Sequence, residues 1–196
     1  MIKNHNRAGW FGASDTKFIM GNWSTSTFMN WWIEKLGVKQ NTLKTEAMIA
    51  GSYKEHQIAQ YYAEQNNTNV ILDRQVKIRK YRLRVNLDCE TNAQIVEIKT
   101  HKLSEKEWKL PKEYVWQVQV QMFVTKKHKA CIYAYALNDD DYNNFYLPIE
   151  EERAKEFDVE YDEVWINNEY LPRLKYLASC LKKRKTPKKE EYEKCL

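Results

Sequence analysis

Two short segments in which apolar and polar residues alternate constrain the fold of this chain more than any other feature. Residues 81–88 show the alternation first, and residues 93–99 resume it after the turn-like tetrapeptide CETN. Because successive side chains of a strand point to opposite faces, each segment is expected to form a strand with one apolar face. We therefore predict a β-hairpin whose polar face ends in Asp88 on the first strand and carries Glu97 and Lys99 on the second.

The polar face of this predicted hairpin has the residue types of a metal-dependent hydrolytic site. Two carboxylates on adjacent strands, Asp88 and Glu97, can hold a hard divalent cation such as Mg²⁺ through their oxygen atoms. Such an ion lowers the pKa of a water, which can then attack a phosphodiester. Lys99 lies two residues after Glu97, so its ammonium group is expected on the same side, where it can orient or deprotonate that water or offset negative charge on the phosphate. Taken alone, the pattern also fits a surface that carries an exposed Glu–Lys pair.

The composition of the 196-residue chain suits one ordinary domain. Hydrophobic residues make up 43% of the chain, which is enough for a packed core and excludes wholesale disorder. The apolar runs are too short to span a bilayer and the N-terminal residues lack an apolar signal segment, so we expect a cytoplasmic protein without a membrane partner. The four cysteines are widely spaced, so we expect reduced thiols rather than a zinc or iron–sulfur site.

Positive charge is concentrated in two segments, although the net charge of the chain is only +5. Residues 74–84 and residues 182–189 each contain six basic and no acidic side chains, whereas residues 150–163 have a net charge of −6. The two basic segments indicate a polyanionic partner such as nucleic acid, although lysine-rich faces that are merely solvated look the same. We expect a single domain over residues 1–181 and a charged C-terminal tail over residues 182–196.

The remaining patterns predict an α/β or α+β fold in which helices flank a mixed central sheet. We expect helices over residues 16–20, 28–36 and 43–65, strands over 130–137 and 144–147, and helices from Glu150 onward. Gly51 weakens the third helix and would permit close packing of its backbone. Periodicity leaves residues 113–125 open, because both a strand and a helix fit them.

Four segments, RAGWFGASD, AGSYKEHQIAQYYAE, RVNLDCETNAQIVEIKT and YVWQVQVQMFVT, follow one another between residues 7 and 125. Together they resemble the PD-(D/E)xK nuclease superfamily, and specifically the phage-recombination exonucleases typified by phage lambda exonuclease and the YqaJ-type viral recombinases. The resemblance implies a restriction-endonuclease-like core, with a catalytic β-hairpin on a mixed sheet flanked by helices. It also assigns residues 113–125 to a helix.

The resemblance implies a role for each residue that matches a motif of the family. The implied metal ligands are Asp88, Glu97, Glu55 and, through its backbone carbonyl, Ile98. Lys99 resembles the catalytic lysine, and Gln117 resembles a helix glutamine that positions the attacking water or the scissile phosphate.

The resemblance also implies residues that bind DNA. Arg7 and Ser14, seven residues apart, resemble a pocket that holds a DNA 5′-phosphate, and Asn86 falls near that pocket. The second arginine of the family's pocket has no clear match in the sequence. By strand alternation, Arg82 and Arg84 share the face of Asp88, so we expect them to guide phosphates.

The resemblance implies a Mg²⁺-dependent exonuclease, with Mn²⁺ as a possible substitute, that degrades double-stranded DNA 5′→3′ from free ends and leaves 3′ single strands for phage-type recombination. It further implies a ring-shaped homotrimer, a single-strand annealing protein as partner, and the cytoplasm of a bacterial host cell. The alternatives are an endonuclease or repair nuclease of the same superfamily, a catalytically silent DNA-binding module, and a structural phage protein with a basic surface.

Overall fold

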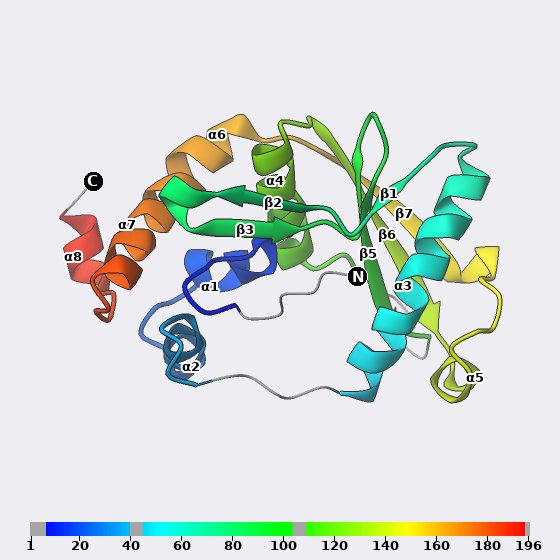
Figure 1. Ribbon diagram of the computed structural model, residues 1–196, viewed down its shortest axis with the longest axis horizontal. Coiled ribbons are helices and arrows are strands. Elements are labelled where there is room, and N and C mark those ends of the chain that lie inside the picture. The colour runs from blue at the N-terminus through cyan, green and yellow to red at the C-terminus, as the bar shows by residue number, and fades with distance from the viewer. Residues whose placement is uncertain (1–6, 40–44, 104–108, 195–196) are drawn as a thin grey trace.

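A five-stranded mixed sheet lies at the centre of the computed structural model, which describes residues 7–39, 45–103 and 109–194 (Figure 1). The strand order is β1-β4-β5-β6-β7. The strands are β1 (Ile71–Leu72), β4 (Cys89–Glu90), β5 (Ile95–Lys102), β6 (Lys129–Leu137) and β7 (Ala154–Glu160). This arrangement confirms the predicted α/β fold class with a mixed central sheet.

Strands β5 and β6 are the only neighbours in this described sheet that run parallel, with register from Ile95↔Ala130 to Lys102↔Leu137. Parallel strands need a crossover connection, which here includes the helix α4 (Lys112–Thr125). Pro111 precedes the first turn of α4, where its lack of an N–H costs nothing. The structure therefore confirms the helix that the resemblance assigned to residues 113–125.

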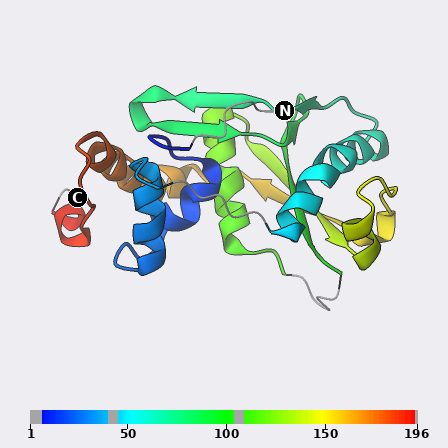
Figure 2. The same cartoon turned by 60° about the horizontal axis from the view of Figure 1, so that its bottom comes forward.

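The two faces of the sheet have separate apolar cores. Helix α3 (Glu46–Gln65) covers one face, where Ile58 and Tyr62 pack with Val96 and Ile98 of β5. Helix α4 covers the other face and separates the sheet from the N-terminal helices (Figure 2). The alternation of β5 therefore directs Val96 and Ile98 toward α3, and Glu97 and Lys99 toward α4.

The other helices and strands surround this layered centre. They are η1 (Ala13–Asp15), α1 (Thr16–Met20), α2 (Ser26–Lys35), β2 (Gln75–Ile78), η2 (Arg79–Tyr81), β3 (Leu83–Asn86), α5 (Asp139–Asn143), η3 (Glu151–Arg153), α6 (Glu163–Trp165), the π-helical η4 (Ile166–Tyr170), α7 (Leu171–Lys182) and α8 (Lys189–Glu193). The three expected helices at the N-terminal side are present as α1, α2 and α3, and residues 43–44 of the third expected helix lie outside the described residues. Within the described residues, no helix is both long enough and apolar enough to cross a membrane.

The predicted hairpin is right for its second strand and wrong for its first. Strand β3 pairs with β2 in a separate two-stranded sheet, and only Cys89 and Glu90 of β4 pair with β5. The connecting turn spans Thr91 to Gln94, where the Thr91 N–H donates to the Gln94 carbonyl at 2.9 Å. The chain changes partner at Asp88 because the apolar side chains of β3 pack in the core beneath α4.

Within the stretch from Glu150 onward, where helices were expected, residues 154–160 form strand β7. Strand β7 pairs antiparallel with β6 and is an edge of the sheet. Its side chains alternate between half-buried Phe157 and Val159 and exposed charged residues, which is typical of an edge strand. Residues 144–147, expected to be a strand, form a turn after α5, whereas α7 is a helix as expected from its leucine stripe.

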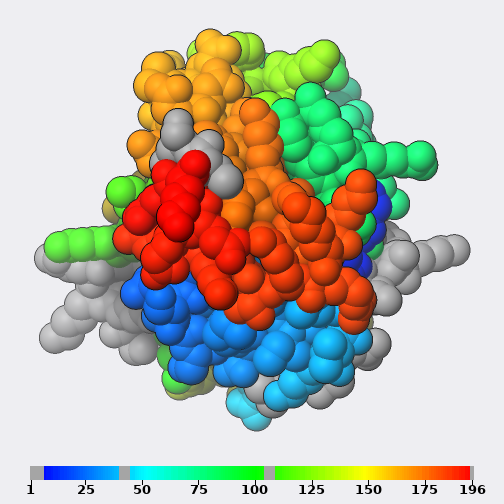
Figure 3. All heavy atoms as spheres, turned by 90° about the vertical axis from the view of Figure 1, so that its left-hand side faces the viewer, coloured from blue at the N-terminus to red at the C-terminus, as the bar shows by residue number. Residues whose placement is uncertain are grey.

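The residues after α7 pack against the N-terminal helices. Trp32 Nε1 donates to the Lys185 carbonyl at 3.2 Å, and Tyr192 of α8 is buried against Trp23. Figure 3 shows α8, in red, next to α2, in blue. The division into residues 1–181 and a tail over 182–196 stays a prediction, but the described part of the tail contributes to the core.

Candidate active site

Glu97 of β5 is the centre of a hydrogen-bonded cluster on the α4 side of the sheet. Its carboxylate is buried and accepts hydrogen bonds from Lys99 Nζ and Gln117 Nε2, both at 2.5 Å from Oε1. Gln121 Nε2 donates to the other oxygen, Oε2. The two glutamines lie one helical turn apart on α4, so both reach the same carboxylate. The carboxylate is therefore held by three donors from two elements.

Asp88 lies at the junction between β3 and β4, next to this cluster. Its Oδ2 accepts the backbone N–H of Ile98 at 2.9 Å, which fixes the carboxyl beside β5. Burial raises the pKa of Asp88 well above its ordinary value, and repulsion by the carboxylates of Glu97 and Glu55 raises it further.

Glu55 reaches the site from helix α3. Burial and repulsion by Glu97 raise the pKa of the Glu55 carboxyl. The approach depends on Gly51, one turn earlier, because a Cβ atom there would lie 2.7 Å from Oγ1 of Thr100 on β5. The close packing expected at Gly51 is therefore present, and it brings a third carboxylate toward the strand.

Lys99 is the cation of this cluster, with a side chain that is 19% exposed. Burial lowers the pKa of Lys99, but attraction by Glu97 and Asp88 outweighs burial, so the pKa lies above its ordinary value. The ammonium group also lies 4.9 Å from the ring centroid of Tyr114, the first aromatic residue of α4. At neutral pH the Lys99 ammonium group therefore carries a positive charge in this cluster.

The three acidic side chains fit a hard divalent cation. Carboxylate oxygens are the ligands that Mg²⁺ prefers, and repulsion among the three carboxylates adds to the effect of burial in raising the pKa values of Asp88 and Glu55. A divalent cation between them would remove this repulsion. The assignment of Asp88, Glu97, Glu55 and the Ile98 carbonyl as metal ligands stays a prediction.

Sequence reasoning missed a second group of possible metal ligands beside the first. Ligand atoms of Glu55, His56 and Asp73 all lie within 4.8 Å of one another, and His56 Nε2 is 3.1 Å from Asp73 Oδ2. The sequence offers no signal for this group, because Asp73 lies 17 residues after His56 and is brought back to it by the chain turn before β2. The contact of Gln121 with Glu97 was also missed, because a glutamine one helical turn after Gln117 could equally have been a packing residue.

The residues expected to bind the DNA 5′-phosphate lie around the start of β3. Arg7 and Ser14 are exposed, whereas Arg84 is only 8% exposed. Burial lowers the pKa of the Arg84 guanidinium, and the nearby positive charge of Arg7 lowers it further. The negative charge of Asp15 opposes this shift. Arg84 therefore lies close enough to Arg7 to be a candidate for the second arginine that the sequence left unmatched. The 5′-phosphate pocket itself stays a prediction.

Two of the residues assigned to DNA lie differently from the strand pattern. Arg82 has a positive φ of 51°, and its Nη1 donates to the Gly9 carbonyl at 3.3 Å. It therefore caps η2 and does not share the strand face of Asp88, because β3 begins only at Leu83. Asn86 is exposed at the end of β3 and accepts a hydrogen bond from Gln75 Nε2 at 2.9 Å.

A buried carboxylate fixes the loop that carries Ser14. Asp15 accepts hydrogen bonds from the Gly12 N–H at 2.6 Å and from Trp31 Nε1 at 2.8 Å, and it forms an ion pair with Lys35. Gly12, rather than Ser14, precedes the first helical turn. The Ser14 hydroxyl is thereby left at the surface of a rigid turn.

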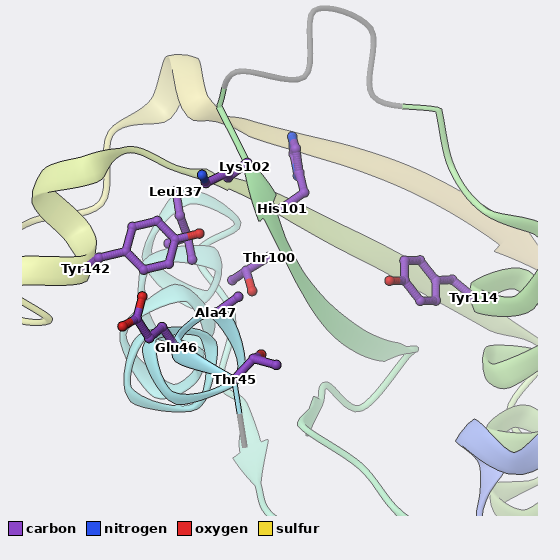
Figure 4. Close-up of a pocket in the computed structure, with 9 residues that line it drawn as sticks. All are labelled: Thr45, Glu46, Ala47, Thr100, His101, Lys102, Tyr114, Leu137 and Tyr142. Atoms are coloured by element: carbon purple, nitrogen blue, oxygen red, sulfur yellow. The ribbon is translucent and has the colours of Figure 1, made fainter. Parts of the chain in front are cut away.

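A pocket of about 540 Å³ opens beyond Lys99, at the end of β5. Figure 4 shows Thr100, His101 and Lys102 of β5 facing it, with Tyr114 on one side and the first turn of α3 on the other. Because Tyr114 also contacts the Lys99 ammonium group, the pocket adjoins the cluster around Glu97. The pocket thus gives the site an opening to solvent.

Comparisons with known proteins agree with this geometry. Residues 4–128 match the YqaJ-like viral recombinase domain family. The chain is similar in structure to an alkaline exonuclease, LHK-Exo, from Laribacter hongkongensis, with 19% identity over 96% of this chain and 92% of that chain and a TM-score of 0.71.

Two further structures give the same picture. LHK-Exo in complex with dAMP matches with 19% identity over 96% of this chain and 92% of that chain, at a TM-score of 0.70. A phage-related exonuclease from Haemophilus somnus matches with 12% identity over 89% of this chain and 92% of that chain, at a TM-score of 0.61. At these identities the likeness concerns the fold. No curated protein matches the sequence.

Proposed function

Because the chain belongs to the YqaJ-like viral recombinase domain family, we propose that it is a Mg²⁺-dependent exonuclease that degrades double-stranded DNA 5′→3′ and leaves 3′ single strands. The observation that carries this proposal is the cluster around Glu97, where two further carboxylates and one lysine converge. Repulsion among the three carboxylates is a reason for the site to bind a divalent cation. Mn²⁺ offers the same charge and similar oxygen preference, so it is the expected substitute.

In the proposed mechanism, Asp88, Glu97 and Glu55, with the Ile98 carbonyl, would hold the cation. When bound, such an ion would promote the ionisation of a water molecule at neutral pH and would stabilise the negative charge on the departing 3′-oxygen. Lys99 carries its positive charge next to Glu97, where it can orient the attacking water and offset charge that develops on the phosphate.

The two glutamines of α4 complete the proposed arrangement. Gln117 and Gln121 donate to different oxygens of the Glu97 carboxylate, which leaves that carboxylate little freedom to rotate. Gln117 shares Oε1 with Lys99, so a shift of one would move the other. We assign Gln117 to the positioning of the water or the scissile phosphate, and Gln121 to the positioning of Glu97.

Recognition of the DNA end is assigned to Arg7, Ser14 and Arg84. The positive charges of Arg7 and Arg84 influence one another, and two nearby guanidinium groups suit a terminal phosphate, which carries more charge than a phosphodiester. We further propose that the enzyme works in the cytoplasm of a bacterial host as a homotrimeric ring, and that it passes its 3′ single strands to a single-strand annealing protein.

The test is digestion of a linear duplex labelled separately at each 5′ end, with Mg²⁺ and with EDTA. We expect early release of both 5′ labels in Mg²⁺, no hydrolysis in EDTA, and no nicking of a covalently closed circle. Cleavage of the circle at a similar rate would instead identify an endonuclease.

A variant of the phosphate pocket sharpens this test. Arg7→Ala should reduce the preference for 5′-phosphorylated over 5′-hydroxyl ends by about tenfold, because one charge-assisted contact is lost. The matched control is Lys17→Ala, which removes an exposed cation from α1. If the wild type digests both kinds of end equally fast, the pocket has no role.

A further inference from the structure

The two basic segments of the sequence meet in one groove, although they are about a hundred residues apart. The groove has a volume of about 670 Å³ and lies between η2 and helix α7. It is lined by Trp10, Arg79, Lys80, Tyr81, Arg82, Lys175, Ala178, Ser179 and Lys182. Figure 3 shows α7, in orange, beside the turn that joins β2 to β3, in green. The groove is thus built by the tip of the β2–β3 ribbon and one face of α7.

The lining of this groove carries an uncompensated positive charge. Five of its nine residues are basic and none is acidic. Arg79, Lys80, Lys175 and Lys182 are exposed. The ion pairs within the described residues involve none of the five cations of the groove. Five cations without carboxylate partners around one hollow form a site for a polyanion.

Two aromatic side chains lie among these cations. Trp10 and Tyr81 both line the groove and are half-buried, so each has a fixed ring with one part open to solvent. Lysine ammonium groups already contact both rings, with Lys77 5.9 Å from the centre of Trp10 and Lys80 4.6 Å from that of Tyr81. Cations that follow a phosphate backbone, interleaved with rings on which bases stack, are typical of sites for single-stranded nucleic acid.

The groove lies at a definite place relative to the candidate active site. The β2–β3 ribbon extends from the central sheet toward α7 (Figure 1). Asp88 follows β3, five positions after Leu83, which at strand spacing is about 17 Å. Arg84, which lies near Arg7, is found between Leu83 and Asp88. The order along the ribbon is therefore the carboxylates, Arg84 with Arg7, and then the basic groove.

We propose that this groove binds single-stranded DNA, namely the 3′ strand that remains after the complementary strand has been digested. The inference rests on the proposed function. If the 5′ end of the digested strand stops at Arg7 and Arg84, that strand does not continue beyond them. Only the complementary strand extends past this point, and it is single-stranded there because its partner has been removed. The groove then retains the enzyme on its product strand between successive hydrolytic steps.

The experiment compares Lys175→Glu/Lys182→Glu with the wild type in Ca²⁺, a cation used to support binding without hydrolysis. The probes are a short blunt duplex and the same duplex extended by a 3′ single strand, each titrated over a salt series. The control is Lys129→Glu/Lys155→Glu, which reverses two exposed charges at β6 and β7. We expect the groove variant to bind the extended DNA about tenfold more weakly, with a salt slope reduced by about 0.7 for each lost phosphate contact.

Three results would overturn the proposal. Equal affinity of groove variant and control for the extended DNA would remove the site. An equal loss of affinity for blunt and extended DNA would make the groove a duplex site. A change in the elution volume of the groove variant without a change in DNA affinity would make it an interface between copies of the chain. Hydrolysis of the blunt duplex by the wild type in Mg²⁺ tests the nuclease function separately, so the two failures are distinguishable.

Discussion

Helix α3 supplies two adjacent residues, Lys54 and Glu55, to two different clusters of charged side chains. The charges are matched in the first cluster and unbalanced in the second. Lys54 is fully buried, with its Nζ 2.8 Å from Asp141 and 2.7 Å from the Leu147 carbonyl. Arg153 contacts the other oxygen of Asp141 at 2.5 Å. Burial raises the pKa of Asp141, but its interactions with Lys54, the Asn138 N–H and Arg153 outweigh burial and lower it below its ordinary value.

The cluster on the other side of α3 has an excess of carboxylates. Glu55, Asp88 and Glu97 share one ammonium group, that of Lys99. Here burial and mutual repulsion raise the pKa of Asp88, whereas in the Lys54 cluster the neighbours lower that of Asp141. A buried charge that is matched within the chain needs nothing from outside. A buried charge in excess marks a site that binds something of opposite charge.

Replacement of Lys99 should give the largest effect, a loss of hydrolysis, and it tests whether the cluster with excess carboxylates is the active site. Lys99→Ala is expected to lower the rate of hydrolysis about 10³-fold, because the cation that orients the water and offsets charge is lost. DNA affinity in Ca²⁺ should change little. Initial rates with labelled duplex measure the first effect, and Lys155→Ala, at an exposed position of β7, is the control. A variant that hydrolyses DNA at the wild-type rate would remove Lys99 from the mechanism.

Replacement of Lys54 tests whether the cluster around Asp141 serves the stability of the fold. Lys54→Met should lower the free energy of unfolding by about 3 kcal/mol, because the carboxylate of Asp141 loses one of two buried cationic partners. Denaturant unfolding followed by tryptophan fluorescence measures the loss. Gln60→Met, at an exposed position of the same helix, is the control and should change the free energy by less than about 0.5 kcal/mol. An unchanged denaturation midpoint for Lys54→Met would contradict the assignment of the Lys54–Asp141 ion pair to the stability of the fold.

Asp88→Asn should give the smallest change in stability, and it tests whether an excess of negative charge destabilises the cluster around Glu97. The folded-state pKa of Asp88 lies above its unfolded-state value, so the ionised carboxylate destabilises the folded protein at neutral pH. The penalty disappears as the pH falls through the folded-state pKa and toward the unfolded-state value of about 3.9. In EDTA the variant should therefore unfold with a free energy about 1 kcal/mol higher at neutral pH.

The pH dependence provides the control for this prediction. The difference between Asp88→Asn and the wild type should narrow on acidification and should reverse when Mg²⁺ is added at neutral pH, because only the wild type keeps the full set of carboxylates. Thermal unfolding over a pH series, with and without Mg²⁺, measures both trends. A lower stability of the variant in EDTA at neutral pH would contradict the assignment of like-charge repulsion to this site.

The sequence predicted those parts of the site that depend on local geometry. Glu97 and Lys99 share a face because they are two residues apart in a strand, and the structure places them in contact. Asp88 was placed near them for a partly wrong reason, since β3 belongs to another sheet. Strand alternation fixes which side chains share a face, but it does not say with which strand that face is paired.

The parts that sequence reasoning missed depend on long-range packing. Gln119 and Gln121 look alike in the sequence, and only the rotation of α4 against β5 turns Gln121 toward Glu97 and Gln119 toward the Glu160 carbonyl. The meeting of Lys182 with Arg82 depends on how α7 packs against η2. Strand β7 resembled a helix because an edge strand carries many charged residues, which blunt pairing with another chain.

Gly51 shows how the demands of a single helix and of the whole protein conflict. In an isolated helix, alanine at this position would be favoured over glycine by about 1 kcal/mol. In the folded protein the same methyl group would collide with Thr100, the residue next to Lys99. The chain is therefore locally frustrated at the point where α3 meets the strand that carries Glu97. Replacing helical glycines by alanine to stabilise the protein would fail at Gly51. The gain in helix propensity would be offset because α3 would have to move away from β5 and would carry Glu55 with it.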